Sequence, residues 1–235
     1  MSELAARLRD VRARIERAAR AAGRDPAEVR LLAVTKTQPP ERVAEAVGLG
    51  LRAFGENRVQ EAEGKIEALR RLTSEPLEWH LIGTLQRNKV KRAAALCDVI
   101  QSVDRAPLVE SLAHEAGALG RRLRVFLQVN VDDEPQKGGC APADLPALAR
   151  RTEASPGLEL LGLMVIPRAC EDPEEVRPSF ARLRALLAEL NRARGDAPPL
   201  RELSMGMSSD FEVAVSEGAT WLRLGTVLFG EREKR

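Results

Sequence analysis

Eight short apolar runs alternate with stretches of helical periodicity along the chain, and this alternation constrains the fold more than any other feature of the sequence. Several runs are apolar on consecutive residues, which is typical of strands that are buried on both faces. Strands that alternate with helices predict a parallel sheet, and eight such units predict one α/β barrel of the TIM type, (β/α)8. The predicted strands are residues 31–35, 53–55, 79–82, 99–103, 125–129, 158–165, 202–205 and 221–224.

An extra N-terminal helix is expected before the first strand. Leu4, Leu8, Val11 and Ile15 recur at helical spacing, and Ser2 is placed to cap the first turn. No linker divides the chain, so residues 1–235 are expected to form a single domain. The alternative is an open doubly wound sheet, which the absence of a GxGxxG motif after any strand disfavours. The other predicted helices are residues 41–49, 59–72, 89–96, 108–119, 145–152, 176–194 and 211–217.

Composition and charge exclude several classes of protein. The 37 basic and 35 acidic residues nearly balance and aromatic residues make up 3%, so a nucleic-acid interface built on stacking rings is not expected. No apolar stretch reaches the ~18 residues that span a membrane, and the N-terminus has no signal-peptide core. The three cysteines lack CxxC spacing, and no metal-ligand spacing is present. We therefore expect a cytoplasmic protein without membrane, nucleic-acid or metal partners.

Lys36 directly follows the first predicted strand, at the end of the barrel where the functional residues of this fold gather. Lysine is rarely buried without a reason. Partial desolvation at this position favours the neutral, nucleophilic amine that forms a Schiff base with an aldehyde. The alternative is a lysine that reaches solvent at the barrel mouth.

The loops after the seventh and eighth predicted strands contain the residue types of a phosphate site. Ser208, Ser209 and Asp210 open a helix, and Gly225 and Thr226 follow the eighth strand. TIM-type barrels commonly bind phosphate with these two loops, because hydroxyls donate and glycine lets the backbone approach. An ordinary N-cap is the alternative for the first loop. Together with the lysine on the first strand, the two loops indicate a phosphorylated aldehyde, pyridoxal 5′-phosphate (PLP).

Four segments also resemble those of one protein family. Residues 33–39 (AVTKTQP), 54–57 (FGEN), 79–89 (WHLIGTLQRNK) and 204–210 (SMGMSSD) resemble the pyridoxal phosphate homeostasis proteins, which are similar to the N-terminal barrel of alanine racemase. The resemblance spans roughly residues 4–232. It implies a PLP barrel of fold-type III without the C-terminal β domain.

The resemblance implies roles for individual residues. Lys36 would carry PLP as a Schiff base, Arg223 would face the pyridine nitrogen, and Asn57 would lie near the ring hydroxyl. Where many relatives have Ser-Asp-Asp, this chain has serine at position 209. The residues that would hold the phosphate are Ser208, Ser209, Gly225 and Thr226.

Arg223 suits this place on chemical grounds. A guanidinium can only donate hydrogen bonds, so the pyridine nitrogen stays unprotonated and is a weaker electron sink. An arginine paired with a strand carboxylate is the alternative. His80 is either a site residue or a hydrogen-bonded core histidine. Asn130 is expected to point to the site without an assigned role, as are Gln86, Asn88 and Lys89 in a loop near the mouth.

These features predict a PLP carrier that buffers the cofactor and delivers it to apo forms of PLP-dependent enzymes. An amino-acid racemase is the first alternative, but racemisation needs an acid or base on each face of the α-carbon. In alanine racemase the second base is a tyrosine of the partner's second domain; this sequence has no tyrosine, and only residues 227–235 follow the eighth strand. No catalytic residue is therefore assigned, and a monomer is expected. The second alternative is a barrel that binds another phosphorylated metabolite through Lys36.

Overall fold

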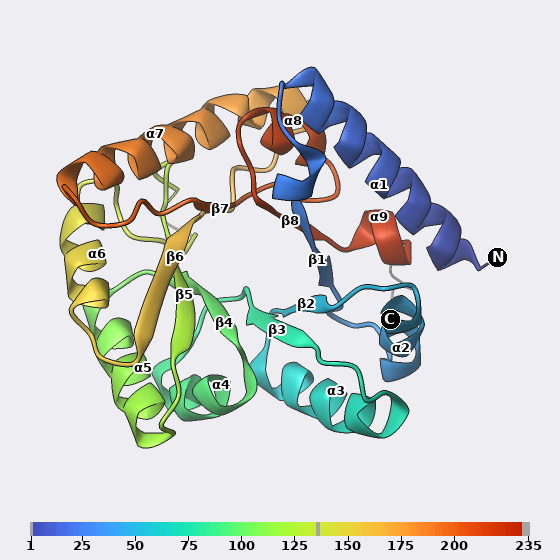
Figure 1. Ribbon diagram of the computed structural model, residues 1–235, viewed down its shortest axis with the longest axis horizontal. Coiled ribbons are helices and arrows are strands. Elements are labelled where there is room, and N and C mark those ends of the chain that lie inside the picture. Colours follow the sequence, from blue (N-terminus) through green and yellow to red (C-terminus); the bar gives the residue numbers. More distant parts are fainter. Residues whose placement is uncertain (1, 135–136, 232–235) are drawn as a thin grey trace.

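Eight parallel strands form a closed barrel in which each strand pairs with the next along the chain and β8 pairs with β1. The computed structural model describes residues 2–134 and 137–231 of the chain. The predicted (β/α)8 barrel is therefore confirmed and the open sheet is excluded (Figure 1). The strands are β1 (Arg30–Val34), β2 (Ala53–Glu56), β3 (Glu78–Leu81), β4 (Val99–Val103), β5 (Leu123–Gln128), β6 (Leu158–Met164), β7 (Glu202–Ser204) and β8 (Trp221–Leu224).

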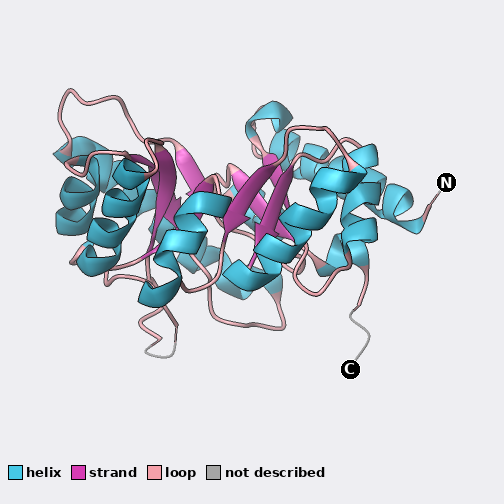
Figure 2. Cartoon of the chain, turned by 90° about the horizontal axis from the view of Figure 1, so that it is seen from below, coloured by secondary structure: helices cyan, strands magenta, loops and turns pink. Residues whose placement is uncertain are grey.

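Helices surround the strands on the outside of the barrel, as Figures 1 and 2 show. The expected N-terminal helix is present, and the Ser2 hydroxyl accepts a hydrogen bond from the Ala5 amide at 3.3 Å. This helix, α1, lies beside α8 and α9. The helices are α1 (Glu3–Ala21), α2 (Pro40–Gly48), α3 (Val59–Leu72), α4 (Val90–Leu96), α5 (Ala106–Ala118), α6 (Leu145–Glu153), α7 (Arg177–Ala193), α8 (Phe211–Ser216) and α9 (Thr226–Phe229), with 3-10 turns at Pro26–Glu28, Arg87–Lys89 and Pro173–Val176.

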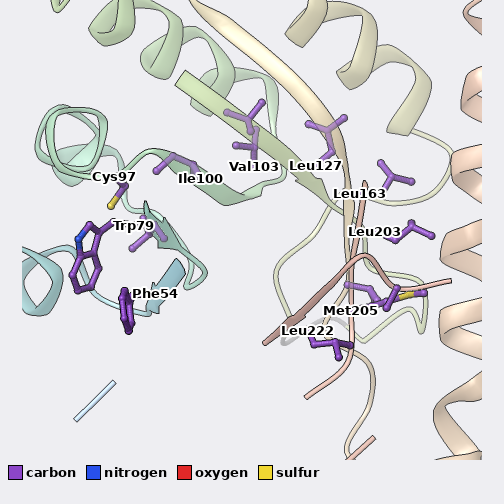
Figure 3. Packing of buried hydrophobic residues seen from close by; sticks show 14 of the residues in the cluster. Phe54, Trp79, Cys97, Ile100, Val103, Leu127, Leu163, Leu203, Met205 and Leu222 are labelled. Carbon is purple, nitrogen blue, oxygen red and sulfur yellow. The ribbon is translucent and has the colours of Figure 1, made fainter. Parts of the chain in front are cut away.

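The larger hydrophobic core lies between the strands and the helices, because alternate strand residues point outward (Figure 3). Phe54 of β2 and Trp79 of β3 pack with their ring centroids 5.5 Å apart. Leu163 and Leu203 continue this layer on β6 and β7, and both are buried. The helices cover the barrel through these contacts.

A second hydrophobic cluster is formed by the opposite faces of the strands, inside the barrel. It contains Leu32, Phe126, Met164, Trp221 and Ile82. Filling the interior with side chains is general for this fold, so the barrel is a packed core and not a pore. The N-terminal ends of the strands carry two ion pairs, which are Arg30 with Glu202 and Arg124 with Glu78. In this fold the functional residues gather at the opposite, C-terminal ends of the strands.

None of the helices among the described residues is long and apolar enough to cross a membrane. Cys97, Cys140 and Cys170 are free. Burial raises the pKa of the Cys97 and Cys140 thiols to about 12, so these two residues act as small core side chains.

Candidate functional site

A cavity of about 840 Å³ opens at the C-terminal ends of the strands, where the fold predicts a site. Its lower wall is apolar and includes Val34, Ile82 and Ile166. The seven residues that the sequence analysis assigns to the cofactor site all line this one cavity, although they come from four parts of the chain: Lys36, Asn57, Ser208, Ser209, Arg223, Gly225 and Thr226. A cavity of about 540 Å³ at the opposite end of the barrel contains none of them.

Lys36 directly follows β1 and is half-buried at the cavity wall. Both flanking peptide units are fixed by side chains of α3. The Thr35 carbonyl accepts a hydrogen bond from Lys65 Nζ, and the Thr37 amide donates one to Glu61 Oε1. Thr37 has a φ of 67°, which lies in the left-handed region that β-branched residues rarely adopt. Such a conformation persists only where the surroundings hold it, so the backbone that carries Lys36 is held in one position.

Thr35, Glu56, Glu61 and Lys65 form a buried charge cluster next to Lys36, which we call the Lys65 cluster. Lys65 Nζ lies 2.6 Å from Glu56 Oε1 and 2.9 Å from Glu61 Oε1, and the Thr35 hydroxyl donates to Glu56 Oε1 at 2.6 Å. Glu56 is fully buried, and its Oε2 has no hydrogen-bond partner among the described residues. Burial raises the pKa of Glu56 although Lys65 opposes this effect. For Glu61 burial is again the largest effect, but the hydrogen bonds from Lys65 and Thr37 outweigh it and lower the pKa.

The loop after β7 is shaped by a glycine and an aspartate. Gly206 has a φ of 91°, and a Cβ atom added there would lie 2.6 Å from the Ala214 Cβ atom, so no larger residue fits this turn. Asp210 Oδ1 accepts a hydrogen bond from the Met207 amide at 2.6 Å. Asp210 is the first flanking residue of α8, but its side chain makes no capping bond to that helix. Asp210 therefore holds the N-cap position without the side-chain bond of an ordinary N-cap.

Ser208 connects the loop after β7 to the loop after β8. Its hydroxyl oxygen accepts hydrogen bonds from the Gly225 amide at 3.3 Å and from the Val227 amide at 3.2 Å. Ser209 and Thr226 line the cavity beside it. The two loops thus form one surface on which hydroxyl groups and backbone amides lie close together.

Arg223 lies at the floor of the cavity on β8 and is 4% exposed. Its Nη1 donates to the Ser204 hydroxyl at 2.9 Å, and its Nη2 donates to the Val165 carbonyl at 2.7 Å. Within the described part of the chain no carboxylate lies at ion-pair distance, so the alternative of an arginine paired with a strand carboxylate is wrong. Burial lowers its pKa to about 10, and the charge of Asp210 acts in the opposite direction. Arg223 is therefore a cation at neutral pH.

His80 is a core residue of β3 and does not line the cavity. It is 1% exposed, and its Nδ1 lies 2.7 Å from Gln101 Nε2. Asn130 was expected to point to the site, and this expectation is wrong. Its amide instead closes a loop by bonding the carbonyl and the amide of Glu134, at 2.9 and 3.2 Å. Asparagine bonds of this kind to nearby backbone are common in turns.

Sequence reasoning missed three polar residues that line the cavity, which are Gln38, Thr84 and Gln128. Gln128 is the last residue of β5, and its side-chain amide donates to the Gly138 carbonyl at 2.7 Å. The rule that strand ends carry functional residues points to it, so this signal was present. Gln86 and Lys89, whose role the sequence leaves open, line an adjoining cavity of about 630 Å³.

Comparisons with known proteins place the chain in a family. Residues 7–233 match the alanine racemase N-terminal domain family. The chain is 49% identical over 233 residues to the pyridoxal phosphate homeostasis protein of Pseudomonas aeruginosa, covering 99% of this chain and 97% of that protein. It is 47% identical over 227 residues to the protein of the same name from Aquifex aeolicus, covering 97% of each. PipY of Synechococcus elongatus, solved with PLP bound, is 41% identical with a TM-score of 0.85, over 97% of this chain and 100% of that one. On these matches the chain belongs to the alanine racemase N-terminal domain family and, within it, to the pyridoxal phosphate homeostasis proteins.

Proposed function

We propose that this protein binds PLP covalently through Lys36 and holds it for delivery to other proteins, with little or no turnover of its own. The observation that carries the proposal is the single cavity in which Lys36, Arg223 and the two hydroxyl-bearing loops come together. The names of its relatives and the PLP bound to PipY support the same cofactor.

The residues present fit PLP in size and in chemistry. Small-molecule sites usually measure about 300–1,000 Å³ and combine apolar walls with a few polar groups. This cavity has that size, and Val34, Ile82 and Ile166 give it an apolar wall suited to an aromatic ring. The hydroxyls of Ser209 and Thr226 suit a phosphate. PLP would supply a reactive aldehyde.

The chain's own residues would divide the work of binding. The Lys36 amine would form a C=N bond with the aldehyde and release water. Arg223 would donate to the ring nitrogen, and because it stays protonated at neutral pH it would not give up its proton to the ring. The phosphate would be held at Ser208, Ser209, Gly225 and Thr226, and Asn57 would lie near the ring hydroxyl.

Poor catalysis follows from two features of the chain. A ring nitrogen that faces a guanidinium is a weak electron sink, which disfavours carbanion chemistry at a bound amino acid. The printed sequence also contains no tyrosine to serve as a second base. The match to an alanine racemase domain makes racemisation the second candidate function. Incubation with L-alanine, followed by chiral chromatography, separates the two, and turnover of ~1–10³ per second would restore the racemase.

Delivery is tested by mixing the PLP-loaded protein directly with the apo form of a PLP-dependent enzyme. In the control, a dialysis membrane separates the two proteins. Direct delivery predicts faster recovery of that enzyme's activity in the mixed sample than in the dialysed one. Equal rates would indicate simple release into solution. We expect the carrier to act as a monomer, which light scattering on the loaded protein measures.

A further inference from the structure

A row of hydrogen bonds crosses the interior of the barrel from Arg223, at the cavity floor, to His80 on β3. Arg223 Nη1 lies 2.9 Å from Ser204 Oγ, which lies 2.6 Å from Gln101 Oε1, and Gln101 Nε2 lies 2.7 Å from His80 Nδ1. These four residues are all at most 4% exposed. We call this row the Arg223–His80 chain; it links β8, β7, β4 and β3. Beyond it, His80 Nε2 lies 3.1 Å from Glu78 Oε1, which is within ion-pair distance, but neither atom has a hydrogen-bond partner among the described residues.

The donor and the acceptor of every hydrogen bond in this row follow from Arg223, its first residue. A guanidinium can only donate, so the Ser204 oxygen accepts from Arg223 and its hydroxyl proton is free to donate to Gln101 Oε1. The amide group of Gln101 is thereby oriented with its Nε2 toward His80, and Nδ1 of His80 must accept. A neutral imidazole that accepts at Nδ1 carries its proton on Nε2, on the side of Glu78.

The row of hydrogen bonds helps to compensate the buried charge of Arg223. A buried cation is costly unless it is paired or well solvated by protein groups. Arg223 has no carboxylate at ion-pair distance within the described residues, and the charge of Asp210 reaches it from farther away. In the chain each acceptor end faces Arg223, and the Glu78 carboxylate lies at ion-pair distance from its last member, His80. Aligned hydrogen bonds polarise one another, so the acceptor that faces Arg223 is strengthened.

We propose that His80, Gln101 and Ser204 are positioning residues for Arg223, which hold the guanidinium in place through a chain of hydrogen bonds of fixed direction that ends at His80, beside Glu78. The direction of the chain rests on the structure alone. Its consequence for a ligand, a guanidinium held beneath the pyridine nitrogen, rests on the function proposed above. This gives His80, whose role the sequence leaves open, a part in the site without contact with the cavity.

The burial of His80 favours the neutral form that the chain needs. Glu78 on β3 and Asp98 before β4 would stabilise a cation, whereas Arg124 on β5 and the burial of the ring oppose it. Burial is the largest effect and lowers the pKa of His80. The Trp221 ring lies 4.8 Å from the imidazole on its β8 side. Contact with His80 lowers the pKa of Glu78, which therefore stays ionised beside the imidazole.

Protonation of His80 would reverse the hydrogen bonds between His80, Gln101 and Ser204. Nδ1 would then donate, the Gln101 amide would have to turn its oxygen toward the ring, and Ser204 would face the amide nitrogen. Ser204 would lose the acceptor for its own proton, and its oxygen would receive two donors. The direction of the chain is therefore a measurable property of His80.

Nitrogen NMR of the histidine side chains tests this direction in the wild-type protein, without any ligand. The sequence has two histidines, and the second, His114, is exposed on α5 and serves as an internal reference. The expected result at pH 7 is a neutral His80 with a proton on Nε2 and a hydrogen-bonded, unprotonated Nδ1. A proton on Nδ1, in either the other tautomer or the imidazolium, would overturn the proposal. Gln101→Glu should move a proton to Nδ1, since a carboxylate cannot donate there, and an unchanged tautomer in this variant would also contradict it.

The effect on PLP is measured with Gln101→Leu, which breaks the chain without touching the cavity. Loosening a hydrogen-bonded cation at the ring should weaken PLP binding roughly tenfold and shift the absorption spectrum of the bound cofactor. Thr152→Val is the matched control, because Thr152 is a fully buried hydroxyl on α6 that bonds the Leu148 carbonyl, far from the chain. Its affinity and spectrum should equal those of the wild type.

Arg223→Met separates failure of this inference from failure of the proposed function. If Arg223→Met changes the affinity and the spectrum but Gln101→Leu does not, Arg223 acts at the cofactor and the positioning chain is wrong. If neither variant changes them, the proposed place of Arg223 at the ring nitrogen is wrong as well. If Gln101→Leu does not fold, the tautomer of His80 in the wild-type protein still tests the proposed direction of the hydrogen bonds.

Discussion

Replacing Lys65 by methionine removes the cation from the middle of the Lys65 cluster while keeping a side chain of similar length. Lys65 is 5% exposed and bonds Glu56, Glu61 and the Thr35 carbonyl. The variant leaves Glu56 buried without its cation. It also leaves the carbonyl of Thr35, which precedes Lys36, without its bond to Lys65.

The expected loss of stability follows from these contacts. Removing one partner of a buried ion pair typically costs about 3–5 kcal/mol, because the remaining charge is left uncompensated. Three hydrogen bonds to or from charged groups would suggest more, at about 1.5–3 kcal/mol each. Glu56 can however take up a proton, since its pKa is already raised, and this limits the penalty. We therefore expect Lys65→Met to lower the free energy of unfolding by about 3–5 kcal/mol.

Urea unfolding of the protein without ligand measures this loss. At an m-value of ~2–3 kcal/mol per molar, the midpoint should fall by more than ~1 M. Lys91→Met is the matched control, since Lys91 is exposed on α4 and should change stability by no more than about 0.5 kcal/mol. The double variant Lys65→Met/Glu56→Gln should lose less than the sum of the two single variants, because position 56 then no longer carries a buried charge without its cation.

The same variant tests the link between the cluster and Lys36. If the Lys65 cluster holds the backbone of Lys36, PLP incorporation into the folded variant should be slower and weaker than in Lys91→Met. A loss of less than 1 kcal/mol together with normal PLP incorporation would refute the reasoning on both stability and position.

The remaining predictions concern the loops and the pH dependence. Ser208→Ala and Thr226→Ala should each weaken PLP binding by about 10–100-fold in a fluorescence titration, and equal affinities for PLP and pyridoxal would contradict phosphate binding at these loops. Gly206→Ala should lower the unfolding midpoint, because the new Cβ meets Ala214 at 2.6 Å and φ is positive, and an unchanged midpoint would contradict this. The pKa of Glu61 lies below its ordinary 4.5 in the folded protein, so its stabilisation is complete above pH ~4.5 and is lost as the pH falls through the lowered value. Glu61→Gln should therefore flatten the acid side of the stability profile measured by urea unfolding at several pH values.

The barrel could be predicted because its strands and helices are marked by periodicity over many residues. Boundaries were off by a residue or two where polar residues extend a strand, as in β5, which begins at Leu123 rather than at residue 125. Helix α9 was not predicted, since its four residues are too few for a periodic pattern. Closure of the barrel followed from the count of eight strand–helix units.

That the seven residues line one cavity could be predicted because the fold places strand ends together. Their roles toward a cofactor stay predictions, and those of Asn57 and Arg223 rest on the family resemblance. Interactions between side chains could not be predicted in the same way. Gln101 and Ser204 are 103 residues apart, and neither has a local signal that it bonds the other. Lys65 lies in a predicted amphipathic helix, and its burial against Glu56 depends on how α3 packs on β2. The error at Asn130 arose because a polar residue at a strand end can serve its own loop instead of the cavity.

The central claim is that Lys36 is the residue that binds the aldehyde of PLP. Borohydride reduction of the PLP-loaded protein converts the C=N bond into a stable secondary amine, and peptide mass mapping then locates the label among the six lysines of the sequence. The account predicts the label on Lys36, and its loss in Lys36→Ala while some PLP affinity remains through the phosphate loops. A label on Lys89 or Lys137 with Lys36 unmodified would contradict it.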